Sequence, residues 1–291
     1  MELPLEPTTT DDPATAALQA VDSQTLLERA LRAAGVDADA SQTRDHLIAA
    51  LSPVERELVA KQVRYAAPQT SYYARLPGLA QLDPTTLVEH VTDSGFGVRL
   101  RAVDELFERH YLLCSTPPGG AQTQLAPAEA DRHTTVATFD SGYDVLAVRA
   151  PTPESAVATS EKLAALGDTD APERLDLRDP DRLTALEADL VHGYHRLILG
   201  VTQPTAQTDR IELTSDGARP GTDLRRDDVV QSLLERPDIR REAGRVTLDP
   251  ASGDSHDRPL VDLRFSDGEI SYRTPQPEAT LLAVDRAIQS L

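Results

Sequence analysis

The feature that most constrains the fold is a series of residues that occurs twice in the chain. The first copy runs from Asp131 to Leu166 and the second from Asp257 to Leu291. Each contains, in order, an Asp-Arg pair, a phenylalanine, a glycine, an arginine and a Pro-x-Pro-Glu sequence. The offset is 126 at the glycine (142 to 268) and 124 at the arginine (149 to 273), so the second copy is two residues shorter between them. The series predicts an internal duplication. The alternative is coincidence, since ββα units are common.

Each copy is predicted to fold as strand, turn, strand and helix. In the second copy, Val261, Leu263 and Phe265 alternate with polar residues, which is the period of a half-buried strand. Gly268 suits the turn, because glycine tolerates positive φ. The Pro-x-Pro-Glu sequence suits a helix entrance, where proline loses no hydrogen bond and glutamate complements the helix dipole. We expect Phe139 and Phe265 to occupy equivalent buried positions.

The repeat extends upstream into a predicted helix and strand. Val103–Arg109 and Val230–Arg236 share apolar residues at helical spacing. A strand is expected behind each helix, over Tyr111–Cys114 and Arg245–Leu248. The predicted fold class is α+β, with two related αβββα units over residues 83–170 and 201–291. The repeated Arg149 and Arg273 are expected to be outward strand residues, or alternatively to face one anion together.

Residues 171–200 are predicted to connect the two units through one long helix. Asp179-Pro180 begins this helix and Gly200 ends it. Its apolar stripe consists of Leu183, Leu186, Leu190, Tyr194, Leu197 and Ile198.

Residues 1–82 are predicted to form a helical module with a disordered start. Helix signals include Ser52-Pro53-Val54-Glu55, a capping box with Ser52 as the N-cap. The helix that it opens is expected to direct Val54, Leu58, Val59 and Val63 inward. The junction also permits a helix-turn-helix interpretation, with Arg56, Lys61, Gln62 and Arg64 exposed. Glu55 and Glu57 lie among them, whereas phosphate binding requires a net basic face, so nucleic acid is a disfavoured partner.

A loop is predicted over Ala67–Asp83, where tyrosines are concentrated. Tyr65, Tyr72 and Tyr73 are three of the seven tyrosines in the chain. Tyrosine suits interfaces because its ring is apolar and its hydroxyl forms hydrogen bonds. These three residues are therefore the predicted interaction site. The alternative is that they pin the loop to its own domain.

The charge of the chain predicts a salt-rich setting. The formal net charge is −19, from 48 acidic and 29 basic residues, and Lys61 and Lys162 are the only lysines. An acidic excess is expected of a protein that remains soluble in molar salt, where ions screen self-repulsion. We therefore expect a halophilic, archaeal, cytoplasmic protein. The alternative is an ordinary acidic protein from a GC-rich genome. No stretch of the sequence resembles a membrane span or a secretion signal.

Candidate chemistry is sparse. Cys114 is the only cysteine, which excludes an internal disulfide, and it is expected to be a small core residue. His192 and His195 are weak candidates for a metal site, because residues i and i+3 share a helix face. A zinc site needs further ligands that the sequence does not nominate. No phosphate-binding loop, nucleophile elbow or dinucleotide fingerprint is present. No cofactor is predicted.

These observations favour a non-catalytic interaction or regulatory protein that binds a protein partner or self-associates. The first alternative is an enzyme or small-molecule sensor with its site between the two repeats. A DNA-binding regulator acting through the N-terminal helices is the second alternative. A pocket that joins residues of both repeats distinguishes the first alternative from the others.

Overall fold

The computed structural model has a mixed α+β fold and describes residues 12–37, 42–91, 97–117, 132–140, 142–205, 208–215, 223–249 and 258–291. The chain divides into two compact units. The first comprises Met1–Ala66 with Pro275–Leu281, and the second comprises Ala67–Thr274 with Leu282–Leu291. Among the described residues, no helix combines the length and the apolar character needed to cross a membrane.

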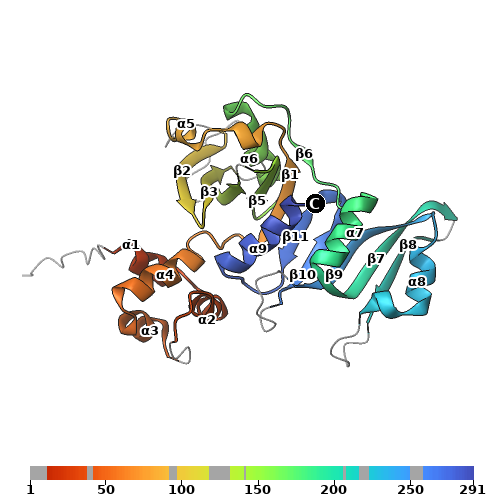
Figure 1. The fold of residues 1–291 in the computed structure, drawn as a ribbon, viewed down its shortest axis with the longest axis horizontal. Coiled ribbons are helices and arrows are strands. Elements are labelled where there is room, and N and C mark those ends of the chain that lie inside the picture. Colours follow the sequence, from red (N-terminus) through yellow and green to blue (C-terminus); the bar gives the residue numbers. More distant parts are fainter. Residues whose placement is uncertain are drawn as a thin grey trace, which may run out of the picture. The chain divides into compact units, whose positions relative to one another are not determined.

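The first unit is built from short helices: α1 (Pro13–Gln19), α2 (Gln24–Ala33), α3 (Arg44–Ala50) and α4 (Pro53–Val63) (Figure 1). Asp12 and Ser23 cap α1 and α2 by accepting from backbone amides. The predicted capping box is confirmed, since the Ser52 and Glu55 side chains each accept from the backbone amide of the other. Each such cap is worth about 1 kcal/mol, which matters for helices this short.

One expectation for α4 is wrong. Val54 and Leu58 were expected to point inward, but they are 70% and 42% exposed. The helix packs against α1 and α2 through the face that carries Val59, Ala60 and Val63. An apolar pair at i and i+4 is therefore left on the solvent side of α4.

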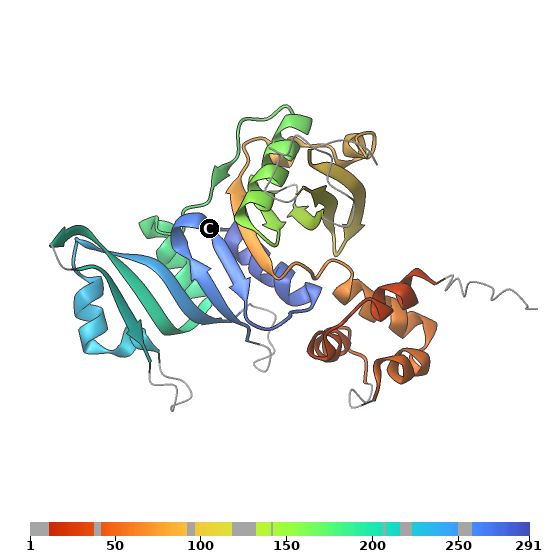
Figure 2. The ribbon, with the colours of Figure 1, turned by 180° about the vertical axis from the view of Figure 1, so that it is seen from behind.

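The second unit contains an eleven-stranded sheet in which every pair of neighbouring strands is antiparallel. Ten strands follow the order β2-β3-β4-β5-β1-β11-β10-β9-β7-β8, and β6 pairs with β1 (Figures 1 and 2). The strands are β1 (Thr70–Arg75), β2 (Arg99–Leu106), β3 (Arg109–Thr116), β4 (His133–Phe139), β5 (Val145–Arg149), β6 (Glu173–Arg174), β7 (Val191–Thr205), β8 (Thr208–Thr214), β9 (Ile239–Leu248), β10 (Leu260–Arg264) and β11 (Glu269–Tyr272).

Strand β1 occupies the middle of this sheet, so the predicted loop over residues 67–83 is wrong. Tyr72 lies opposite Val148 of β5 on one side and Glu269 of β11 on the other. The segment Thr70–Arg75 contains residues that favour strands, threonine and tyrosine, and its backbone is paired on both sides. β1 thereby joins β2–β5 to β7–β11.

Helices α6 (Pro153–Leu166) and α9 (Glu278–Gln289) lie on opposite faces of the sheet. On β4, Thr135 contacts Thr159 of α6, whereas the next residue, Val136, lies opposite Arg149, which binds Asp285 of α9. Successive strand residues point to opposite faces, so these two contacts lie on different faces. The remaining helices of the second unit are α5 (Pro84–Val88), α7 (Pro180–Asp189) and α8 (Asp228–Leu234).

A hydrophobic core fills the space between α6 and its face of the sheet. Its buried residues include Leu112, Phe139 and Val148 from the strands and Leu163 from the helix. Cys114 belongs to this core and is 1% exposed, which confirms its expected place. Burial raises the pKa of its thiol to about 12, so the sulfur stays protonated at neutral pH.

Both predicted ββα segments have that order of elements. They are β4-β5-α6 in the first and β10-β11-α9 in the second, and Phe139 and Phe265 are both fully buried. Gly268 has a φ of +55°, and a Cβ there would lie 2.6 Å from the Leu175 carbonyl oxygen, so the turn requires glycine. The second segment is preceded by α8 and β9.

The helix predicted over Val103–Arg109 is wrong. These residues belong to β2, a turn and the start of β3. Phe107 and Glu108 have φ values of 53° and 61°, and Leu106 pairs with Arg109. Positive φ at both turn residues is the geometry of a two-residue type I′ hairpin, which matches the twist of the paired strands. Strand pairing therefore outweighs the helical spacing of the apolar residues.

The predicted long connecting helix is also wrong beyond Asp189, because β7 begins at Val191. The register of β7 against β9 shifts between Val191 and Gly193 and again between Tyr194 and Arg196. These two β-bulges leave His192 and His195 as inserted residues. Val191, Tyr194 and Leu197 consequently lie opposite alternate residues of β9, on one face, at a spacing of three. The two bulges thus space the apolar residues of this strand by three positions, which resembles the spacing on one face of a helix.

Candidate functional site

A concave site of the second unit lies beside Tyr72 on β1. It is a pocket of about 400 Å³, which we call the Tyr72 pocket. Its lining comes from β1, α6, β6 and the β10–β11 hairpin: Tyr72, Tyr73, Ala74, Pro153, Glu154, Ala156, Val157, Ser160, Glu161, Pro172, Arg174, Arg264, Asp267 and Glu269. The pocket thus combines residues of both predicted repeats with the central strand.

The charged residues of the Tyr72 pocket differ in their partners. Arg174 pairs with Asp267 at 3.3 Å, and Arg264 approaches Glu269 at 3.5 Å. Glu154 and Glu161 of α6 are exposed and form no ion pair with any described residue. The apolar wall therefore ends in a rim with two uncompensated carboxylates.

Tyr72 is half-buried in this pocket, and its hydroxyl is a hydrogen-bond donor under ordinary conditions. Burial, followed by the negative charge of Glu269, raises the pKa of Tyr72 to about 12. A phenol with that pKa is protonated at neutral pH. It is suited to donating a hydrogen bond and to presenting an aromatic face, and not to acting as a base.

Tyr73 faces the other side of the sheet and is only 1% exposed. Its hydroxyl donates to Asp285 Oδ1 at 2.6 Å, and Arg149 Nη2 donates to Asp285 Oδ2 at 2.8 Å. Burial and the Asp285 charge raise the pKa of Tyr73 well above its ordinary value. The side chains of Arg149 and Asp285 are both 0% exposed. Arg149 is therefore an inward residue, contrary to expectation, whereas Arg273 is exposed.

Further bonds hold the C-terminal half of α9 against the strands. Gln289 accepts from Arg109 of β3 and donates to the Val145 carbonyl. Arg286 donates to the Phe107 carbonyl in the β2–β3 turn at 3.2 Å. Asp285 and Gln289 are thus buried polar residues near one helix end, and Arg286 adds an exposed contact. The sequence carried a signal for the burial of Asp285, since this residue shares the helix face of Leu281 and Ile288.

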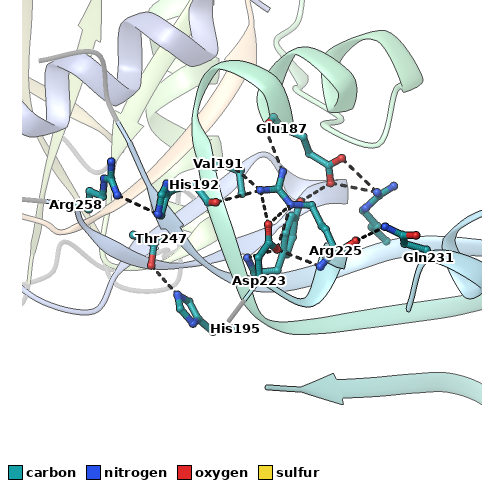
Figure 3. Close-up of polar contacts among 11 residues, drawn as sticks. Glu187, Val191, His192, His195, Asp223, Arg225, Gln231, Thr247 and Arg258 are labelled. Atoms are coloured by element: carbon teal, nitrogen blue, oxygen red, sulfur yellow. Dashed lines mark hydrogen bonds and ion pairs between the residues drawn. The ribbon is translucent and has the colours of Figure 1, made fainter. Parts of the chain in front are cut away.

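His192 and His195 lie on β7 and have separate partners (Figure 3). His192 is exposed, and its Nε2 lies 2.9 Å from Arg258 Nη1. An arginine only donates, so this ring nitrogen accepts. His195 Nε2 lies 2.7 Å from Thr247 Oγ1. The helical arrangement behind the metal hypothesis is not present, and the described residues contain no group of three or more His, Cys, Asp or Glu able to hold a metal.

A polar cluster centred on Arg225 lies beside the same strand (Figure 3). Arg225 pairs with Asp223 at 2.8 Å and donates to the carbonyls of Glu187, Val191 and His192. Burial raises the pKa of Asp223, but hydrogen bonds from Arg225 and the Tyr194 amide outweigh it and hold that pKa below its usual value. Because Arg225 donates hydrogen bonds to backbone carbonyls of α7 and β7, the cluster stabilises the connection between these two elements.

In the first unit, Tyr65 is buried, with the Arg64 guanidinium 5.4 Å from its ring centre. Two of the groups expected on a DNA-reading face are engaged within the unit. Gln62 is buried and accepts from the Ala279 amide, and Arg56 pairs with Asp12 at 3.2 Å.

No known protein family matches the chain, and no curated protein resembles it significantly.

Proposed function

We propose that this protein is a non-catalytic binding protein whose ligand is a small molecule with an apolar body and a cationic group. The observation that carries the proposal is the Tyr72 pocket, with a half-buried aromatic side chain in its wall and unpaired carboxylates at its rim. Its volume of about 400 Å³ falls in the range typical of small-molecule sites.

The chemistry of the lining supports a cationic ligand. An aromatic face attracts an ammonium or guanidinium group by about 0.5–1 kcal/mol at an exposed site. Glu154 and Glu161 add a negative field at the entrance, while the two arginines of the pocket already have acidic partners. A ligand of this kind would pair charges that have no ion-pair partner among the described residues.

Binding fits the residues better than catalysis does. Tyr72 has a pKa of about 12, so its hydroxyl is not a base at neutral pH. These groups support a regulatory protein that senses a small molecule. Residues of both predicted repeats would surround the ligand.

A protein partner or self-association is the second candidate, and the exposed apolar pair Val54 and Leu58 on α4 favours it. Tyr65 and Tyr73 are buried, so among the three predicted interaction tyrosines only Tyr72 offers surface to a ligand. DNA binding is less well supported, because Arg56 and Gln62 are engaged internally and Glu57 is exposed on the same helix.

The test uses phenylethylammonium as the probe and neutral 2-phenylethanol as its uncharged match, in isothermal titration calorimetry in molar KCl. We expect saturable binding of the cation that is weakened at least tenfold by Tyr72→Ala and severalfold by Glu154→Gln with Glu161→Gln. Tyr143→Ala, which removes an exposed tyrosine outside the pocket, is the control and should change nothing. Equal binding of both probes, or full binding by Tyr72→Ala, would contradict the proposal.

An internal duplication is a further part of this proposal, restricted to the two ββα segments. The shared order of elements and the burial of both phenylalanines support it. An experimental structure in which the two ββα segments do not superpose around Phe139 and Phe265 would contradict the duplication. The proposed setting is a halophilic, archaeal cytoplasm, for which the net charge of −19 is the support.

A further inference from the structure

Strands β7, β8, β9 and β10 carry a cluster of arginines on the face of the sheet that points away from α7. Strand register places Arg196, Arg245 and Asp262 in one row across three strands, and Ile198, Ala243 and Arg264 in the next row. Tyr194, which binds Glu187 of α7, points to the other face. Figure 2 shows these strands from the side away from α7.

These residues surround a depression of about 310 Å³, which we call the arginine trough. On β9 the small side chain of Ala243, which lies on this face, leaves room for it. Four arginines and one acid line the trough: Arg196, Arg210, Arg245, Arg264 and Asp262. Among the lining residues positive charge is in excess, on a chain whose net charge is −19. Outside the lining, Glu212 pairs with Arg196 and Glu269 with Arg264.

The arrangement has an electrostatic cost in the free protein. Arg196 and Arg245 lie directly opposite each other on neighbouring strands, where like charges destabilise a sheet. Each is held through its Nε by a carboxylate, Arg196 by Glu212 at 2.7 Å and Arg245 by Asp262 at 2.9 Å. These bonds orient the two guanidinium groups. An arginine has five N–H donors, so their terminal nitrogens still have donors for an anion.

We infer that the arginine trough binds a small, doubly charged oxyanion, either free phosphate or the phosphate of a monoester. The planar guanidinium fork matches phosphate oxygens in pairs, and such charge-assisted bonds are about twice as strong as neutral ones. An ion with two negative charges relieves the repulsion between the facing arginines. A monocarboxylate offers a single charge and relieves less of it.

The charge distribution favours a small anion over a nucleic acid. Nucleic-acid affinity comes from neutralising many phosphates along an extended basic surface. Here the basic groups occupy one depression in a strongly acidic chain, whose remaining surface repels a polyanion.

The test is isothermal titration calorimetry of the full chain in 1 M KCl with three probes: inorganic phosphate, glycerol phosphate and a short single-stranded oligonucleotide. We expect phosphate or glycerol phosphate to saturate one site, and the tighter of the two identifies the source of the phosphate group. Arg196→Gln with Arg210→Gln should weaken binding at least tenfold. Arg210→Lys, which keeps the charge but loses the fork, should weaken it severalfold.

Arg236→Gln is the matched control, since Arg236 is exposed and paired with an acid outside the trough, and it should leave affinity within twofold. Arg210→Gln alone removes an exposed side chain and tests the site if the double variant fails to fold. Arg264 lines both the trough and the Tyr72 pocket. Tyr72→Ala keeps Arg264 and should not change phosphate affinity, so this inference and the proposed function are tested separately. The inference is overturned if neither phosphate probe saturates, if Arg210→Gln binds as well as wild type, or if the oligonucleotide binds more tightly than both.

Discussion

Removing the Asp285 carboxylate should destabilise the second unit more than any exposed substitution. Asp285 is the shared acceptor for Arg149 and Tyr73, and no part of the Arg149 or Asp285 side chain is exposed. Asp285→Ala would remove the carboxylate that the buried Arg149 guanidinium binds at 2.8 Å and the acceptor of the buried Tyr73 hydroxyl.

The magnitude follows from these two losses. Breaking a buried ion pair by deleting one partner costs about 3–5 kcal/mol. Stranding a buried hydroxyl adds about 1–3 kcal/mol. The sum is comparable with the whole stability of a typical domain, about 5–15 kcal/mol. At about 2–4 °C per kcal/mol for a unit of this size, we expect the Tm to fall by roughly 8–32 °C.

Urea unfolding in molar KCl, followed by far-UV circular dichroism, measures this loss. Tyr73→Phe removes only one hydrogen bond and should cost about 1–3 kcal/mol. Replacing the set with apolar groups, Tyr73→Phe with Arg149→Met and Asp285→Leu, should recover most of the stability, since the desolvation cost of the ions disappears. Asp189→Ala, at an exposed site, is the control. If Asp285→Ala lies within about 1 kcal/mol of wild type, the buried network does not stabilise the unit as argued.

Four further predictions concern separate features. Because the net charge is −19, the Tm should rise with KCl well beyond the roughly 0.15–0.5 M over which simple screening does most of its work, and a flat Tm from low to molar salt would contradict the halophilic assignment. The pKa of Asp223 is lower in the folded state than in the unfolded state. The ionised Asp223 therefore stabilises the folded state above its unfolded pKa of about 4, and this stabilisation is lost as the pH falls through the folded-state pKa. Asp223→Asn should be less stable at pH 7 and should flatten the acid limb of a curve of Tm against pH. Cys114, with a pKa of about 12 and 1% exposure, should resist a thiol reagent in the native protein and react in urea, whereas rapid native labelling would show that the core opens. Gly268→Ala should lower the Tm by several degrees, because an added Cβ would meet the Leu175 carbonyl at 2.6 Å, and an unchanged Tm would show that the turn relaxes freely.

Local signals in the sequence predicted local structure well. The capping box at Ser52 and Glu55 is confirmed, because it depends on residues three positions apart. The burial of Cys114 is confirmed for a similar reason, since its apolar neighbours indicate a buried strand. The elements β10, β11 and α9 follow from alternation and turn residues within a few positions.

Errors arose where distant partners or irregular pairing decide the structure. Strand β1 is recognisable only with β5 and β11, which lie far away in the sequence. The bulges at His192 and His195 gave β7 a period of three, which no single-sequence pattern separates from a helix.

For the candidate site too, the sequence indicated single residues but not their long-range arrangement. The sequence drew attention to Tyr72 and Tyr73, but it is alternation along β1 that sends one to a pocket and the other to a buried carboxylate. Asp285 was visible as a charged residue on an apolar helix face. The arginine trough had no linear signal, because its members come from four strands that meet only through register.

The central position of β1 has a consequence for the order in which the second unit forms during synthesis. Thr70 of β1 and Ser271 of β11 are in contact across 201 positions of the chain. A ribosome that adds about 5–20 residues per second needs some 10–40 seconds to supply that partner. Until then one side of a strand that ends up in mid-sheet has no backbone partner, and exposed strand edges of this kind favour aggregation. Pairings between such distant segments also form slowly. Nascent chains of this protein should therefore depend on chaperones that cover strand edges more than their modest length suggests.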